Sequence, residues 1–157
     1  MTVRFATPED REEWLRLRSA LWPDCPLSEH REEMKEIRSD PRHNVVLVSE
    51  AEDGHLNGLL EVSIRAVAPG CATRNIGYLE GWYVEPAYRR QGVGRTLVEA
   101  AERWARSIGC TEMASDTGIE NNESQEAHTR LGYREIERVV HFCKSLQIES
   151  ETEERER

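Results

Sequence analysis

The stretch YVEPAYRRQGVGRTLVEAAERWA, residues 83–105, changes character in its middle. A strand-like run ends at Pro86, two arginines follow, and Gly92 and Gly94 precede an apolar segment of helical period. The N-terminus of a helix presents main-chain N–H groups without intrahelical partners and the positive end of the helix dipole. Glycines at that point let the main chain approach a bulky anion closely. The stretch therefore indicates a phosphate site, with a plain loop entering a helix as the alternative.

Two common phosphate-binding motifs do not fit this stretch. A dinucleotide-binding fingerprint needs a third glycine, but Leu97 stands in its place and the preceding half of the chain lacks a clear βαβ unit. A Walker loop needs lysine after its last glycine, but Gly94 is followed by Arg95. What remains is the spacing Arg89-x-x-Gly92-x-Gly94 directly behind a strand.

The charge of the chain narrows the class of partner. The 157 residues carry a formal net charge of −9. Residues 149–157 hold five acids and two arginines, a net charge of −3, which leaves −6 on the rest of the chain. Nucleic-acid binding needs a basic face, so we expect no nucleic-acid partner. The summed field of an acidic protein attracts a cationic ligand instead.

The cysteines and the hydropathy pattern bear on the compartment. The four cysteines, at positions 25, 71, 110 and 143, are scattered without CxxC or Cys/His spacing, so we expect reduced thiols and no metal. No apolar run approaches the roughly 20 residues that a membrane helix needs. The first ten residues lack the basic and then apolar pattern of a signal peptide. A cytoplasmic protein without a membrane partner is expected.

Periodicity and turn signals predict one domain over residues 1–146 and a charged, disordered tail over 147–157. The expected order of elements is βααβββαβαβ, an α/β plan whose first half is largely antiparallel. Gly81, inside the fourth strand, predicts a bulge. The expected strands cover 2–6, 43–51, 56–67, 76–86, 110–116 and 133–146, and the expected helices cover 7–22, 27–39, 91–107 and 121–132.

The arginine–glycine loop, the order of elements and ENNESQEAHTRLGY at 120–133 resemble the GCN5-related N-acetyltransferases (GNAT) over residues 2–145. The resemblance implies an α/β (α+β) fold with a mixed central sheet, splayed fourth and fifth strands and about four flanking helices. It also implies acetyl-CoA as co-substrate, with the diphosphate on main-chain amides, the pantetheine arm along the fourth strand and one main-chain N–H of that strand as oxyanion donor. The cofactor-binding residues that it implies are Val84 (also the oxyanion donor), Arg89, Gln91, Gly92, Val93, Gly94, Arg95 and Asn121.

Four further stretches are similar to the bacterial aminoglycoside 6′-N-acetyltransferases. They are LWPDCP at 21–26, YLEGWYVEP at 78–86, EMASDTGIENNESQEAH at 112–128 and GYREIERVVHF at 132–142. This similarity implies an enzyme that acetylates the 6′-amine of a polycationic antibiotic and so confers resistance. In these enzymes the loop between the third and fourth strands often carries an Asp-Tyr pair. RAVAPGC at 65–71 has none, so any sugar contact made by that tyrosine is absent here.

The same similarity assigns the substrate-binding and catalytic side chains. Glu80, Asp116 and Glu137 are the implied ligands of the cationic sugar. Either Asp116 or Glu80 accepts the proton of the amine, directly or through water. Trp22 either offers an apolar face to a sugar ring or packs in the core. His128 stands where related enzymes carry a proton-donating tyrosine, so it either protonates the departing sulfur or is a structural histidine of its helix.

Two other functions are compatible with the same residues. The acceptor is then a polyamine, another metabolite or a protein amine, or else the chain is a non-catalytic acyl-CoA-binding module. Retention of Glu80, Asp116 and His128 speaks against the second of these. GNAT enzymes are often homodimers, so the resemblance also implies a homodimer.

Overall fold

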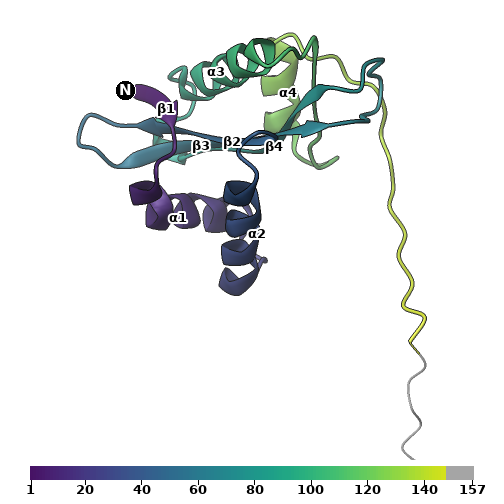
Figure 1. Cartoon of the computed structure of the whole chain (residues 1–157), viewed down its shortest axis with the longest axis horizontal. Coiled ribbons are helices and arrows are strands. Elements are labelled where there is room, and N and C mark those ends of the chain that lie inside the picture. Colours follow the sequence, from purple (N-terminus) through teal and green to yellow (C-terminus); the bar gives the residue numbers. More distant parts are fainter. Residues whose placement is uncertain (148–157) are drawn as a thin grey trace, which may run out of the picture.

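The computed structural model describes residues 1–147 and shows one mixed five-stranded sheet, in the order β1-β2-β3-β4-β5, with helices on both faces (Figure 1). The first four strands pair antiparallel and β5 runs parallel to β4, so the predicted mixed sheet is confirmed for its first five strands. The predicted tail 147–157 lies, apart from its first residue, outside the described residues. The strands are β1 (Thr2–Phe5), β2 (Asn44–Glu50), β3 (Leu56–Arg65), β4 (Ile76–Val84) and β5 (Glu112–Ser115); the helices are α1 (Arg11–Leu21), α2 (Leu27–Ser39), α3 (Val93–Ser107) and α4 (Asn122–Arg130), with short 3-10 turns η1 (Pro8–Asp10) and η2 (Pro86–Tyr88).

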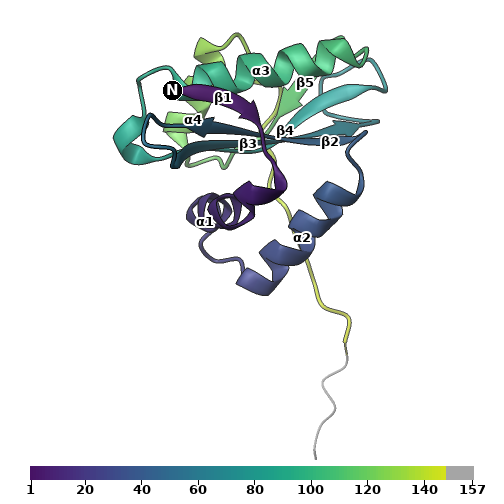
Figure 2. The same ribbon diagram turned by 60° about the vertical axis from the view of Figure 1, so that its left-hand side comes forward.

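Two apolar layers hold the helices on the sheet. Helices α1 and α2 cover one face and α3 covers the other (Figure 2). Successive side chains of a strand point to opposite faces, so Val46 and Val48 of β2 join the α1–α2 layer while Leu47 joins the α3 layer. The α3 layer is completed by Leu97 and Ala101, four residues apart on one side of the helix. None of the helices within residues 1–147 is long and apolar enough to cross a bilayer.

The strand predicted over 133–146 is wrong for the single chain. Residues 133–147 have no regular secondary structure, and the end of this segment runs away from the sheet (Figure 1). A strand exists only where a neighbour accepts its main-chain hydrogen bonds, and within the described residues β5 pairs with β4 alone. Ile136 packs against Gly70 in the loop before β4. The alternating pattern that suggested the strand is present, but its apolar side chains are exposed.

A buried arginine connects α1, α2 and the sheet. The Arg18 guanidinium, 3% exposed, donates to both carboxylate oxygens of Glu61 on β3 at 3.1 Å. It also donates to Nδ1 of His30 on α2 at 3.3 Å. Glu61 accepts a further hydrogen bond from Nε1 of Trp14 at 2.6 Å. Burial raises the pKa of Glu61 to about 6, although Arg18 opposes the shift.

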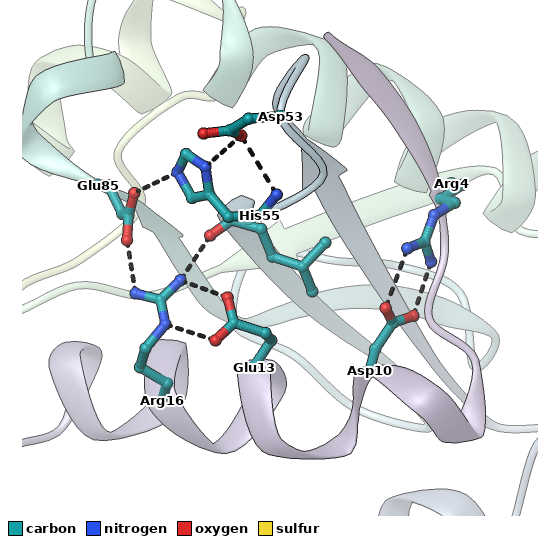
Figure 3. A network of polar contacts seen from close by, with 8 residues as sticks. Arg4, Asp10, Glu13, Arg16, Asp53, His55 and Glu85 are labelled. Atoms are coloured by element: carbon teal, nitrogen blue, oxygen red, sulfur yellow. Dashed lines mark hydrogen bonds and ion pairs between the residues drawn. The ribbon is translucent and has the colours of Figure 1, made fainter.

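A second polar network fixes the segment that follows β4 (Figure 3). Arg16 of α1 donates to the Glu85 carboxylate at 2.5 Å and to the Leu56 carbonyl at 2.7 Å. His55, in the turn between β2 and β3, contacts Asp53 at 2.6 Å and Glu85 at 3.3 Å. Its hydrogen bond to Asp53 is the main reason why the pKa of His55 is raised. These contacts hold Glu85, which immediately precedes η2 and the loop into α3.

We predict that Arg18→Met lowers the free energy of unfolding by about 3–5 kcal/mol near neutral pH, because it leaves the Glu61 carboxylate buried without its cation. A folded-state pKa above the unfolded value means that protonation of Glu61 favours the folded chain. The loss should therefore shrink as the pH falls from about 8 to about 5, which urea denaturation at the two pH values measures.

The matched control for this prediction is Arg16→Met, whose guanidinium is 42% exposed and should contribute about 1 kcal/mol or less. The double variant Arg18→Met/Glu61→Gln should recover part of the loss near pH 8, because its buried side chain carries no charge. An equal loss for Arg18→Met at both pH values would contradict the prediction.

Candidate active site

The central feature of the site is the point where β4 and β5 separate. Their parallel pairing ends at Leu79 and Ser115, and within residues 1–147 no strand pairs with the β5-side edge of β4 beyond that point. On its other edge β4 has a bulge. Gly81 pairs with Glu61 of β3 and Leu79 pairs with Val62, the residue that follows Glu61. Glu80 is the extra residue of this bulge. The predicted bulge and splay are thus both confirmed, and they leave an open strand edge from 80 to 84.

Trp22 lies against the bulge. A Cβ atom at position 81 would come within 2.9 Å of Cζ2 of Trp22, so only glycine allows this approach. The ring also lies 4.9 Å from the Arg18 guanidinium, and the main-chain oxygen of Trp22 accepts from Nε2 of His30 at 3.2 Å. The ring is partly buried and borders a hollow of about 500 Å³ with Pro23 and neighbouring residues. The buried arginine network therefore sets the position of Trp22 next to β4.

Two of the predicted acids meet at the separation point. Glu80 pairs with Arg65 of β3 through bonds of 2.8 and 2.6 Å and also accepts from Ser63. Asp116, directly after β5, accepts from the Tyr78 hydroxyl at 2.7 Å. The Arg65 guanidinium lies 3.5 Å from the centre of the Tyr78 ring, so the two pairs are adjacent. Burial, with Asp116 as the next cause, raises the pKa of Tyr78.

Their partners make the two acids chemically different. The Glu80 carboxylate is neutralised by a guanidinium. Within residues 1–147 Asp116 forms no ion pair. A carboxylate held only by a phenol hydroxyl keeps lone pairs available for a proton or an ammonium ion.

His128 sits on α4 facing the end of β5. Its Nδ1 donates to the Ser124 carbonyl at 2.7 Å, which leaves Nε2 to accept from the Ser115 hydroxyl at 2.8 Å. The ring also stands edge-on to Trp82 at 5.3 Å and to Tyr133 at 5.7 Å. These contacts anchor the imidazole and aim it at Ser115, the last residue of β5 that pairs with β4.

The glycine-rich loop has the geometry of an anion cradle. Gly92 caps α3 with a φ of 89°, in the left-handed region, and Arg90 also has a positive φ of 60°. Within the described part of the chain, the main-chain N–H groups of residues 91–95 donate to no protein acceptor. Gly94 lies so close to Trp82 that a Cβ would be 2.9 Å from its Cζ2. The loop residues therefore fit a diphosphate such as that of acetyl-CoA.

Several predicted cofactor side chains support the loop instead of projecting from it. Arg89 donates to the Val84 carbonyl at 2.9 Å, and Gln91 donates to the Ala87 carbonyl at 2.8 Å. Val93 is buried in the α3 layer. Asn121 caps α4 by accepting from the Ser124 N–H at 3.1 Å. Arg95 is exposed in the first turn of α3, next to the free amides.

Glu137, the third predicted acid, is not on a strand of this chain. It belongs to the irregular segment after α4 and lines, together with Asp116 and His128, a groove beside β5. No hydrogen bond joins Glu137 to Glu80 or Asp116 within residues 1–147. The structure thus brings Glu80, Asp116 and Trp22 to the separation point and leaves Glu137 at its margin.

Four residues of the site were missed by the sequence analysis. They are Arg65, Tyr78 and Ser115, each hydrogen-bonded to a predicted residue, and Arg18, whose guanidinium lies 4.9 Å from the centre of the Trp22 ring. The sequence did carry a signal for Arg65 and Tyr78. Arg65 is two residues from Ser63 on β3 and Tyr78 is two residues from Glu80 on β4, so alternation places all four side chains on one face of the sheet. Arg18 shows no such signal, since an arginine on an amphipathic helix is ordinarily exposed.

The comparisons with known proteins agree with this geometry. The family model described as "Acetyltransferase (GNAT) family" matches residues 11–133. An aminoglycoside N(6′)-acetyltransferase type 1 of Klebsiella aerogenes is 47% identical over 146 residues, which cover 92% of this chain and 96% of that protein. A protein of the same name from Stenotrophomonas maltophilia is 41% identical over 149 residues, or 93% of this chain and 94% of that protein.

Solved structures agree as well. The apo aminoglycoside 6′-N-acetyltransferase AAC(6′)-IG of Acinetobacter haemolyticus superposes with a TM-score of 0.85 at 36% identity, covering 94% of this chain and 100% of that one. AAC(6′)-Iy in complex with the bisubstrate analog CoA-S-monomethyl-acetylneamine gives a TM-score of 0.86 at 36% identity, covering 92% and 97%. The chain therefore belongs to the acetyltransferase (GNAT) family and, within it, to the group of the aminoglycoside N(6′)-acetyltransferases.

Proposed function

We propose that this enzyme transfers the acetyl group of acetyl-CoA to the 6′-amine of aminoglycosides and thereby confers resistance to them. The observation that carries the proposal is the gathering of Asp116, Glu80 and Trp22 where β4 and β5 separate, in a chain 47% identical to an enzyme of that name. We also propose that residues 1–146 form one catalytic domain, that the enzyme is a homodimer and that it works in the cytoplasm, where its four free cysteines stay reduced.

The cofactor is held along two main-chain features. The N–H groups of residues 91–95 bind the diphosphate, with the Arg95 guanidinium nearby, and the open edge of β4 from 80 to 84 binds the pantetheine arm. Asn121 closes the other side of the slot from the start of α4. The Val84 N–H donates to the carbonyl oxygen that gains charge during transfer. Acetyl-CoA supplies the acetyl group as an activated thioester.

The substrate is held by charge and by one aromatic ring. Asp116, Glu80 and Glu137 bind the ammonium groups of the drug, and the face of Trp22 packs against a sugar ring. The loop 65–71 offers no tyrosine for a further sugar contact. Holding the amine next to the thioester accounts for much of the rate enhancement, because the translational and rotational entropy of the reacting groups is already lost on binding.

Asp116 is the proposed general base. It is free of any ion pair within residues 1–147, whereas the lone pairs of Glu80 are engaged by Arg65 and Ser63. Glu80 therefore binds and orients the drug. On the acid side, His128 acts as a positioning residue, because its Nε2 accepts from the Ser115 hydroxyl and so fixes Ser115 at the separation point. The proton that the departing thiolate takes up is balanced by the proton that the amine gives to Asp116.

The test of the function is thiol release from acetyl-CoA by the purified full chain. Tobramycin and kanamycin should give rapid release, whereas spermidine and a lysine-containing peptide should give little, because neither offers amines on a rigid sugar frame. Minimum inhibitory concentrations for a susceptible host expressing the chain should rise in parallel. Faster turnover of spermidine or of the peptide would reassign the acceptor, and no release with any amine would remove the proposed activity.

Asp116→Asn should lower kcat by about 100-fold or more, since it removes the general base while keeping the shape of the side chain. Glu80→Gln should mainly raise KM for the drug. Tyr78→Phe is the matched control, because it removes only the hydroxyl that donates to Asp116 and leaves the carboxylate in place. An Asp116→Asn enzyme with kcat within about twofold of the parent would exclude Asp116 as the base.

Gly94→Ala should weaken CoA binding by about tenfold, as measured by titration calorimetry. The added methyl group meets Trp82 at 2.9 Å, and relieving such overpacking costs about 1–3 kcal/mol in displacement of the loop or the ring. Gly118→Ala is the matched control, because nothing lies within 4 Å of the corresponding Cβ and the φ of Gly118 is not positive. Equal CoA affinities of the two variants would contradict the proposed seat of the diphosphate.

A further inference from the structure

We propose that Gln125 on α4 is a positioning residue for acetyl transfer, because its side-chain amide holds the loop 116–121 and so keeps the Asp116 carboxylate at the separation point. The inference deepens the proposed function and rests on the proposed role of Asp116 as the general base. The loop 116–121 has no regular secondary structure and connects β5 to α4. Asp116 is its first residue, and Asn121, which caps α4, is its last.

The loop 116–121 has few contacts besides those with Gln125. Residues 118–121 are exposed, and Ile119 is 50% exposed although it is apolar. A Cβ atom at Gly118 would meet nothing within 4 Å. In the part of the chain that the structure describes, Gln125 is the only residue whose side chain forms a hydrogen bond to any of residues 117–120. A segment with so few contacts has low local stability, so the loss of one anchor should change its position.

The Gln125 amide makes two hydrogen bonds to the loop. Its Nε2 donates to the Ile119 carbonyl at 2.9 Å and to the Gly118 carbonyl at 3.3 Å. A primary amide carries two N–H groups, so one side chain serves both carbonyls. The Gly118 carbonyl also accepts from the Asn121 main-chain N–H at 2.9 Å, which closes a turn just before α4. Gln125 therefore ties this turn to the helix that follows it.

Helix α4 holds the chain on both sides of Asp116. On the preceding side, Nε2 of His128 accepts from the Ser115 hydroxyl at 2.8 Å. On the following side, Gln125 donates to the carbonyls of residues 118 and 119. Gln125 and His128 are three residues apart, so they lie on the same side of the helix. Within residues 1–147 the Asp116 carboxylate itself has a hydrogen bond only with Tyr78, so its position depends on how the chain is held on either side.

The other end of the loop is fixed without the Gln125 side chain. Asn121 accepts from the Ser124 N–H through its side chain, and its carbonyl accepts from the main-chain N–H of Gln125, both at 3.1 Å. Loss of the Gln125 amide should therefore release the Asp116 side of the loop and leave the cofactor side in place. A general base must lie within hydrogen-bond reach of the amine, and a shift of about 1 Å can lower the rate by about 100-fold.

The test is the kinetics of tobramycin acetylation by the purified full chain. Gln125→Met keeps the length of the side chain but donates no hydrogen bond, and it should lower kcat by about tenfold with KM for acetyl-CoA within about twofold of the parent. Gln125→Glu should lower kcat as much, because an ionised carboxylate cannot donate to the two carbonyls, although it still accepts from Arg138. The matched control is Glu126→Met, which removes only an exposed pair with Arg130 and should keep the kcat of the parent.

A double-mutant cycle shows whether Gln125 acts through Asp116. In an Asp116→Asn background, Gln125→Met should lower kcat by less than about twofold, because a base that is already absent cannot be displaced. Losses that multiply would overturn the inference and leave Asp116 as the base, and so would a kcat of the parent's size in Gln125→Met or Gln125→Glu. An Asp116→Asn enzyme with the kcat of the parent would overturn both the general base and this inference.

Hydrogen exchange separates a displaced loop from a folding defect. The Asn121 N–H, which donates to the Gly118 carbonyl, should exchange about tenfold faster in Gln125→Met than in the parent, while the N–H groups of β2 keep their rates. Unchanged exchange at Asn121 would overturn the inference. Faster exchange throughout the sheet in both Gln125 variants would overturn it as well, because the loss of kcat would then follow from unfolding.

Discussion

The early end of the β4–β5 pairing is the constraint on which the rest of the site depends. β5 stops at Ser115 and β4 bulges at Glu80, so the two strands separate after Leu79. This leaves main-chain groups of β4 without partners in the middle of a folded sheet, which is costly unless a ligand or water satisfies them. The glycine-rich loop, Glu80 with Asp116, and the Ser115–His128 pair all border the same opening. A single register change in the sheet thus creates the slot and orients what lines it.

The interior beneath the slot is polar to an unusual degree. Arg18, Glu61 and His30 are buried between α1, α2 and β3, directly under the bulge and Trp22. Burying ions costs several kcal/mol unless their geometry is satisfied, so such a network contributes little to net stability. What it does supply is orientation, because the bonds of Arg18 to Glu61 fix α1 relative to β3 and its bond to His30 fixes α2 relative to α1. The position of Trp22 is therefore set by electrostatics in the core and not by packing alone.

The fold and the phosphate loop were predictable from the sequence because their signals are local. Gly92 and Gly94 have the conformation and close contact that only glycine allows, and alternation along β2 matches the two apolar layers. Family membership, predicted from the motifs, is confirmed by the relatives. The last strand failed because a strand needs a neighbour as well as a pattern. The pairing of Glu80 with Arg65 was also missed, because it depends on register across two strands, and register depends on the bulge.

The pair of Arg65 and Glu80 has a consequence for selectivity. An ammonium ion that binds Glu80 exchanges with a guanidinium already there, so one positive charge replaces another and the net electrostatic gain is small. The gain is larger at a carboxylate that has no resident cation, such as Asp116 within residues 1–147. A substrate with one amine therefore gains little binding free energy at Glu80. A substrate with several amines on a rigid frame adds the contributions of all the carboxylates that it reaches. Selectivity between amine substrates then depends on the number and spacing of their positive charges and not on the strength of any one ion pair.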